Sequence, residues 1–186
     1  MPRSSQTGFT SFSIDDLLLG LLMAGPKHGY QLYQDYEQHF LPIWKVGRSK
    51  FYASLALLHD LHDLDVETEF QADHPPRKVY HLTTAGRARF EEWLYRPVMP
   101  MRAIRVEFLA KLRFMTLLHL DDPQRIFDDQ IEVCAATLGA FQIDASADPD
   151  ADPVLDLVAD FRRRQATFII EWLHACRDRL RQGTSL

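Results

Sequence analysis

The chain has 186 residues, of which 46% are hydrophobic, so it is long enough to bury a core and to hold one domain with an appendage. Its formal net charge is −5, and any contact with nucleic acid therefore needs a local basic patch. The longest apolar stretch, residues 17–24, is far shorter than the ~20 residues that cross a bilayer, which excludes a membrane span. Cys134 and Cys176 form no CxxC pair and the chain start does not look like a signal peptide, so we expect a cytoplasmic protein.

Three helices are predicted in the first third of the chain. Ser13, followed by acids, caps the first helix, which ends near Gly25. A second, short amphipathic helix covers residues 30–42. The third covers residues 48–64 and presents a single apolar stripe to the core. The stripe consists of Phe51, Leu55, Leu58 and Leu61.

The next segment changes to the alternating pattern of a half-buried strand. Apolar and polar residues alternate over residues 66–71, turn-forming residues follow at 72–76, and the alternation returns over 77–83. This pattern predicts a β-hairpin, after which Thr83 or Thr84 caps a helix that continues through Leu94. The buried side of the first strand is predicted to carry Val66, Thr68 and Phe70.

Prolines mark the predicted domain boundary. Pro97 and Pro100 bracket a short connector. We therefore expect a disordered tail over residues 1–12, a first domain over 13–98 and a helical domain over 99–186.

Three more helices are predicted after this boundary. They cover residues 102–120, residues 123–143 with Asp122 as the cap, and the chain from residue 154 onward, while residues 144–153 form an exposed linker. The last helix carries large side chains at alternating steps of four and three, which is typical of a packed helix pair. This stripe consists of Val154, Val158, Phe161, Gln165, Phe168 and Trp172.

The predicted order of three helices, a two-stranded hairpin and a helix is that of a winged helix-turn-helix. In such modules the helix before the hairpin enters the major groove of DNA, and the hairpin, or wing, follows the phosphate backbone. Residues 41–58 contain three basic residues and no acid, while the acids of residues 60–69 are expected at the far end of the helix or the base of the wing. Charge and position select Arg48, Ser49, Lys50, Arg77 and Lys78 as DNA-contacting residues.

Four short motifs in this order resemble the N-terminal domain of the PadR family of transcriptional regulators. The resemblance covers about residues 13–95, and residues 107–112 are similar to the start of the family's C-terminal dimerisation region. The motifs are the leucine-rich segment 17–25, His28-Gly29-Tyr30, Tyr52-Ala53-Ser54-Leu55, and Pro76-Arg77-Lys78-Val79-Tyr80-His81-Leu82-Thr83-Thr84-Ala85-Gly86.

The resemblance implies a mainly α fold with a small β-hairpin wing, followed by a helical C-terminal dimerisation domain. It implies a dimeric repressor of operator DNA, with Tyr52 hydrogen-bonded to the DNA backbone, whereas His28 and Tyr30 are interpreted as packing between the first two helices. It also implies a small aromatic effector, and the candidate pocket residues are Trp93, Phe114 and Phe127. The candidate dimer contacts are Leu17, Leu21, Phe108, Leu112, Val158, Phe161, Phe168 and Trp172.

Two other functions fit parts of the sequence. A metal-dependent phosphohydrolase could use His59, Asp60, His62 and Asp63, since His at positions i and i+3 lie on one helix face, but no second ligand set appears elsewhere. A helical protein-interaction module would explain the C-terminal stripe and leave the wing without a role. We interpret the His-Asp cluster as polar residues at an exposed helix end, and expect no metal, no cofactor and no enzymatic activity.

Overall fold

The structure is a computed structural model, and it describes residues 12–71, 74–99, 101–143 and 153–182. It divides into two compact units, Met1–Leu120 and Asp121–Leu186, called here the N-terminal and C-terminal units. Over the described ranges, no helix combines the length and the apolar character that spanning a membrane requires.

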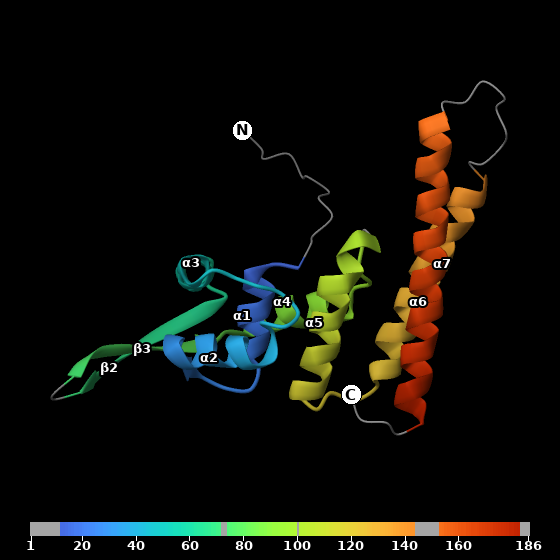
Figure 1. The fold of residues 1–186 in the computed structure, drawn as a ribbon. Coiled ribbons are helices and arrows are strands. Elements are labelled where there is room, and N and C mark those ends of the chain that lie inside the picture. The colour runs from blue at the N-terminus through green and yellow to red at the C-terminus, as the bar shows by residue number, and fades with distance from the viewer. Residues whose placement is uncertain (1–11, 72–73, 100, 144–152, 183–186) are drawn as a thin grey trace. The chain divides into compact units, whose positions relative to one another are not determined.

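The N-terminal unit contains helices and a small antiparallel sheet in the order of a winged helix-turn-helix, which confirms the predicted fold class (Figure 1). Its elements are α1 (Ile14–Leu22), β1 (Lys27–His28), α2 (Gly29–His39), α3 (Arg48–Asp60), β2 (Leu64–Gln71), β3 (His74–Leu82), α4 (Thr84–Tyr95), the 3₁₀ turn η1 (Met101–Ala103) and α5 (Ile104–Leu117).

Helix α1 is the centre of this unit. It begins with a capping box, in which the Asp16 amide donates to Ser13 Oγ at 3.2 Å and the Ser13 amide donates to the Asp16 carboxylate at 3.0 Å. Almost every side chain along the helix is buried. Gly20 lies in the middle because a Cβ there would stand 2.4 Å from the Phe114 ring and 2.5 Å from the Phe90 ring. The missing side chain therefore lets α4 and α5 approach α1 closely.

Helix α3 ends earlier than its apolar stripe predicts. Phe51, Leu55 and Leu58 are buried as expected. Leu61 is 53% exposed, so the prediction that it belongs to the buried stripe was wrong. The physical reason is the turn that follows, in which His62 adopts a left-handed backbone conformation with φ 61°. That turn ends the helix and gives the buried position to Leu64 at the start of β2.

The sheet has three strands in the order β1-β3-β2, one more than predicted. Lys27 and His28 were interpreted as a break between helices, but they pair antiparallel with Tyr80 and Val79 of β3. The β2–β3 register is regular from Leu64↔Leu82 to Glu69↔Arg77 and shifts between Glu69 and Gln71.

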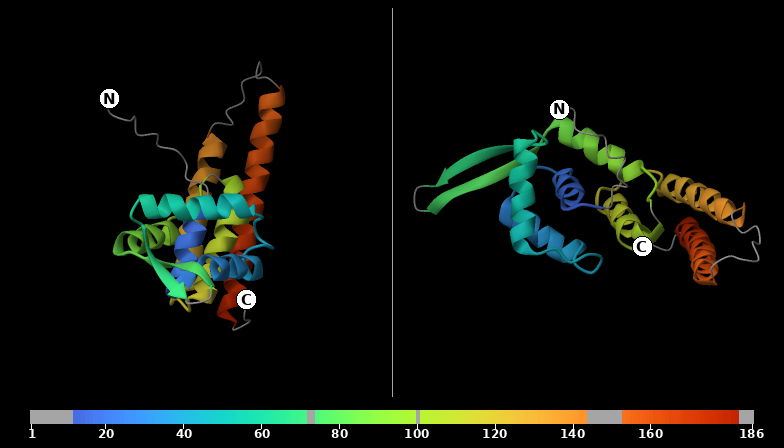
Figure 2. Two further views of the ribbon diagram at one scale, coloured as in Figure 1. Left: turned by 90° about the vertical axis from the view of Figure 1, so that its left-hand side faces the viewer. Right: turned by 90° about the horizontal axis from the view of Figure 1, so that it is seen from above.

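The outer part of the wing has no core above it. The β2–β3 ribbon extends beyond the helices of the N-terminal unit (Figure 2). Thr68 is exposed and Phe70 is 82% exposed, so the prediction of a half-buried strand was wrong at these positions. Alternation along a strand shows which residues share a face, but a neighbouring layer decides whether that face is buried.

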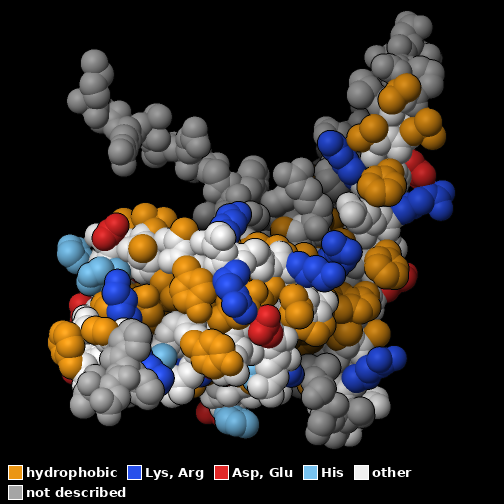
Figure 3. Space-filling model, turned by 60° about the vertical axis from the view of Figure 1, so that its left-hand side comes forward, with side chains coloured by type: hydrophobic (Ala, Val, Ile, Leu, Met, Phe, Trp, Pro, Cys, Tyr) orange, Lys and Arg blue, Asp and Glu red, His pale blue; other side chains and the backbone are white. Residues whose placement is uncertain are grey.

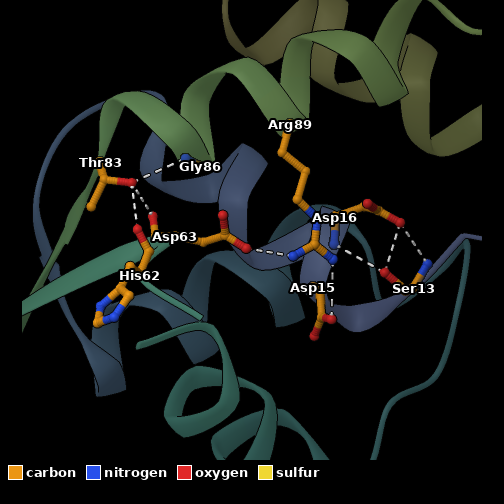
Figure 4. Close-up of polar contacts among 8 residues, drawn as sticks. All are labelled: Ser13, Asp15, Asp16, His62, Asp63, Thr83, Gly86 and Arg89. Carbon is orange, nitrogen blue, oxygen red and sulfur yellow. Dashed lines mark hydrogen bonds and ion pairs between the residues drawn. The ribbon is translucent and has the colours of Figure 1, made fainter. Parts of the chain in front are cut away.

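A polar cluster at the corner between α3, the wing and α4 joins these elements, and we call Asp15, Asp63, Thr83, Gly86 and Arg89 the corner cluster (Figure 4). Arg89 contacts the Asp63 carboxylate at 2.5 Å and the Asp15 carboxylate at 3.4 Å. The Thr83 hydroxyl donates to the Asp63 carbonyl oxygen at 2.9 Å and accepts from the Gly86 amide at 3.0 Å, so Thr83 is the cap of α4. The cluster fixes the start of α4 against the end of α3.

Helix α5 belongs to the N-terminal unit, so the division falls after Leu120 and differs from the expected boundary near residue 98. Its Glu107 carboxylate is buried and accepts hydrogen bonds from the Trp93 indole at 3.1 Å and the Phe12 amide at 3.2 Å. Lys111 Nζ lies 3.4 Å from the same carboxylate. Burial raises the pKa of Glu107 and lowers the pKa of Lys111 to about 8. These buried contacts tie α5 to α4 across the proline connector.

The C-terminal unit is a pair of helices, α6 (Pro123–Ile143) and α7 (Pro153–Arg181), which run antiparallel (Figure 1). Asp122 precedes α6 as predicted, and its carboxylate accepts from the Arg125 amide at 3.3 Å. Near the end of α7, Arg177 binds Asp128 of α6 at 2.6 Å. The predicted tail over residues 1–12 and the linker over 144–153 lie almost wholly outside the described residues.

The corner cluster predicts that Gly86→Ala destabilises the protein. A Cβ at this position would stand 2.2 Å from the backbone oxygen of Asp63, so the change must push α4 away from the wing. We expect the free energy of unfolding, measured by urea denaturation, to fall by about 3 kcal/mol. The control is Gly139→Ala in α6, where a Cβ meets nothing within 4 Å, and it should stabilise by up to about 1 kcal/mol. Equal stability of Gly86→Ala and the parent would show that α4 can shift without cost.

Candidate nucleic-acid interface

The N-terminal turn of α3 is exposed and has no side-chain cap. Its N-cap is Gly47, which offers no side-chain hydrogen bond, and no acid lies in the first turn. Arg48, Ser49 and Lys50 are all exposed there. The amide groups of a first helical turn have no partner within the helix, and the helix dipole is positive at this end. The turn therefore combines free donors and cations in the arrangement that binds phosphate.

Aromatic rings hold this turn in place. The Arg48 guanidinium lies 4.5 Å from the centroid of the Tyr33 ring, and the Tyr33 ring stacks on Tyr52 with centroids 6.3 Å apart. Tyr52 is 39% exposed, and its hydroxyl donates to the Gly29 carbonyl oxygen at 3.4 Å. Tyr52 thus joins α3 to the start of α2 while it keeps part of its ring accessible.

A groove of about 660 Å³ lies beside Tyr52, between the start of α2 and strand β3. It forms where β1 ends, because β1 pairs only with Val79 and Tyr80 and does not cover the edge of β3 beyond them. The groove brings together the predicted residues Tyr52, Arg77 and Lys78. Its lining residues are His28, Gly29, Tyr30, Gln31, Gln34, Tyr52, Arg77, Lys78 and Tyr80.

Tyr30 and Gln34 are among the groove residues that the sequence analysis did not place in the site. Tyr30 was interpreted as packing between helices, but it is 64% exposed, so that interpretation was wrong. Its hydroxyl accepts a hydrogen bond from Gln34 Nε2 at 3.0 Å, which places both polar groups along the groove. The signal in the sequence was the i+4 neighbour of Tyr30, which is the polar Gln34.

The wing register separates its two cations. Arg77 stands opposite Glu69 and Lys78 stands opposite Thr68, so the two cations project from opposite faces of the ribbon. Glu69 was expected near the base of the wing and lies instead across from Arg77. Lys78 therefore lies on the same face of the ribbon as Thr68. The paired residues of β2 on this face include no acid.

On the face drawn in Figure 3, Lys and Arg side chains lie among hydrophobic groups. An acidic chain thus carries the local basic surface that DNA binding requires.

Comparison with known proteins agrees with this geometry. Residues 18–92 match the family model of the Transcriptional regulator PadR-like family. The Negative transcriptional regulator PadR of Bacillus subtilis is 28% identical over 71% of this chain and 75% of that protein. Over residues 18–92 the chain is therefore similar to the PadR-like family of transcriptional regulators.

The comparisons extend beyond the winged domain of this PadR-like chain. Residues 104–181 match the family model Virulence activator alpha C-term. A Probable transcriptional regulator of Mycobacterium tuberculosis is 26% identical over 40% of this chain and 39% of that protein. The crystal structure of Bacillus subtilis PadR in complex with operator DNA has a TM-score of 0.46 at 25% identity and covers 89% of this chain and 96% of that one.

The His-Asp cluster of this PadR-like chain has structural contacts. Asp63 binds Arg89, His59 Nδ1 lies 3.1 Å from the Leu64 carbonyl oxygen, and His62 forms the turn after α3. Within the ranges that the structure covers, no three His, Cys, Asp or Glu side chains gather as a metal site would require. Asp60 is exposed at the end of α3.

The predicted effector residues do not line one cavity within either described unit. Trp93 and Phe114 pack edge to face, with centroids 6.0 Å apart, in the core of the N-terminal unit. Phe127 is fully buried and belongs to α6 of the C-terminal unit. The small aromatic effector stays a prediction.

The predicted dimer contacts fall into two groups. Leu17, Leu21, Phe108 and Leu112 are each at most 7% exposed in the single chain, so these side chains are already used in its core. Phe108 and Leu112 were expected at the interface because residues 107–112 resemble the start of a dimerisation region, and the first helix was expected to add to it, but neither expectation distinguishes a core from an interface.

The second group lies on α7. Val158 is 38% exposed, Phe161 and Phe168 are each 66% exposed, and Trp172 is half-buried. Three of the four α7 positions are therefore accessible to a partner.

Proposed function

We propose that this chain is a dimeric repressor that binds double-stranded operator DNA through α3 and the wing of each protomer. The observation that carries the proposal is the groove that brings Tyr52 of α3 together with the wing cations Arg77 and Lys78, next to the uncapped basic first turn of α3. The helix supplies contacts in the major groove, and the wing supplies contacts to the adjacent phosphate backbone.

The exposed face of α3 suits close approach to base pairs. Ala53 and Ala56 are exposed between the basic first turn and the end of the helix. Their short side chains let the helix backbone come near the floor of a major groove, and a methyl group can contact the methyl group of thymine. Arg48 and Lys50 at the start of the helix then reach phosphates at the groove edge.

Dimerisation is supported by the accessible stripe of α7. A different face of the helix, with Ala166, Ile169 and Leu173, is buried in the chain, so the exposed rings of Phe161 and Phe168 are not needed for that packing. A helix with two large exposed aromatic rings on one stripe is typical of an interaction surface. Two winged domains held about one DNA turn apart would read two half-sites.

Repression is supported by the relative that is named a negative transcriptional regulator. A dimer that covers two half-sites within a promoter blocks access of the transcription machinery by occupancy alone, and needs no enzymatic step.

The first test of this function removes the cations of α3. Arg48→Ala with Lys50→Ala should weaken binding to a duplex of the protein's own promoter region in a gel-shift assay. Each lost phosphate contact lowers the slope of log affinity against log salt by about 0.9, so we expect a decrease of up to about 1.8 per protomer. The matched control, Arg87→Ala with Arg105→Ala, removes the same charge from exposed positions of α4 and α5 and should leave the slope unchanged. Identical slopes for both variants would remove α3 from the interface.

The wing should add affinity without sequence preference. Lys78→Ala and Arg77→Ala are expected to weaken specific and random duplexes by similar factors, because a wing meets phosphates more than base edges. The loss should be larger for Lys78→Ala, since Arg77 faces Glu69 across the ribbon. Fluorescence anisotropy measures the affinity of each variant for the promoter duplex and for a random duplex. A loss confined to the promoter duplex would mean that the wing reads bases.

The third test addresses the dimer. Phe161→Asp with Phe168→Asp places two charges in the accessible stripe of α7, so the protein should become monomeric by light scattering and lose promoter binding. The circular dichroism of the winged domain should persist, since neither side chain lies in its core. The control, Thr167→Asp, adds an acid at an exposed position of α7 outside the stripe and should remain dimeric. A parent that is monomeric at micromolar concentration would contradict this interface.

A further inference from the structure

Phe70 is the most exposed large hydrophobic side chain among the described residues, at 82%. It lies on β2 one residue before Gln71, the last residue of that strand. The β2–β3 ribbon extends beyond the helices of the N-terminal unit (Figure 2), and at 82% exposure the Phe70 ring is not covered by the described residues of this unit. A single large ring at the end of a polar ribbon is therefore not part of the core.

The backbone around Phe70 is unusual in one respect. The register passes from Glu69↔Arg77 to Gln71↔His74, so one residue of β2 stands opposite two residues of β3. Those two residues are Pro75 and Pro76, and a proline has no amide hydrogen to donate to a ladder. The resulting bulge increases the local twist of the ribbon and ends the regular pairing at Phe70.

Charge distinguishes the two faces of the wing. Alternation places Phe70 on the face that also carries Thr68 and its partner Lys78, while Glu67 and Glu69 project from the other face. Lys78 lines the groove with Tyr52. Phe70 thus shares with Lys78 a ribbon face on which the paired residues of β2 include no acid.

We propose that Phe70 is a wedge that enters the minor groove beside the operator half-site. Minor-groove proteins insert apolar side chains of this kind between base pairs and partly unstack them. The free energy needed to deform DNA for such an insertion depends on its sequence, and it is lowest at flexible pyrimidine–purine steps such as TA and CA/TG. Phe70 therefore reads the deformability of the flanking DNA, which adds specificity that α3 and the wing cations do not supply. This inference rests on the DNA binding proposed above.

The experiment compares Phe70→Ala with the parent on promoter duplexes that differ only at the flank. One duplex has a TA step where the wing lies, and the other has a stiff A-tract there. Burial of a phenylalanine ring corresponds to roughly a tenfold or larger gain in affinity, so Phe70→Ala should lose about tenfold on the TA duplex and little on the A-tract. The salt slope should be unchanged, because no charge is removed, in contrast to Lys78→Ala. Phe70→Trp should restore the preference.

A second measurement follows the DNA directly. A 2-aminopurine placed at the TA step should brighten when the parent binds and unstacks it, and should stay dim with Phe70→Ala. Because Phe70 is exposed, its variants should melt at the temperature of the parent, which checks their fold.

The outcomes separate the two proposals. If the parent binds neither duplex, the proposed function fails and the wedge fails with it. If the parent binds and Phe70→Ala shows the same affinity and flank preference, only the wedge is overturned. If Phe70→Ala instead changes the oligomeric state without DNA, the ring is a contact between two copies of the chain, and the wedge is again overturned.

Discussion

The geometry of the proposed DNA-binding surface depends on the ion pairs of Arg89. This one side chain binds Asp63, at the end of α3, and Asp15, in α1. Asp63 is largely buried, so the Arg89 guanidinium replaces for its carboxylate part of the hydration that burial removes. Because Arg89 projects from α4, the three elements are fixed together at one point, and the wing, which starts at Leu64, leaves the core in a defined direction.

The corner cluster fixes α3 at its C-terminal end and leaves its N-terminal end accessible. At the anchored end, Thr83 binds the Asp63 carbonyl oxygen and Gly86 allows α4 to pass close to it. At the other end, Gly47 provides no capping side chain, and Tyr52 and Tyr33 support the exposed turn. A helix held rigidly at one end can present its unsatisfied amides and cations at the other without ordering a loop when DNA binds.

The order of elements could be predicted from the sequence because local signals define it. Caps such as Ser13 and Thr83, and the change from helical to alternating periodicity, depend only on nearby residues. Strand β1 could not be predicted, since two residues have no periodicity and their conformation is set by pairing with β3. The exposure of Phe70 and the burial of Leu17 could not be predicted either, because an apolar pattern does not show which surface packs against the apolar side chains.

Neighbouring charges indicate what the exposed aromatic rings contact. On α7, acids and arginines near Phe161 neutralise each other, as Asp160 does with Arg164 at 2.7 Å, so this surface suits another protein surface. On the wing, the described residues provide no ion pair for Lys78, which shares a ribbon face with Phe70. An unpaired cation and an aromatic ring on the same face suit a nucleic acid, because its phosphates are anionic and its bases are flat and can stack. The two proposals therefore assign the same residue type to a protein contact on α7 and to a nucleic-acid contact on the wing.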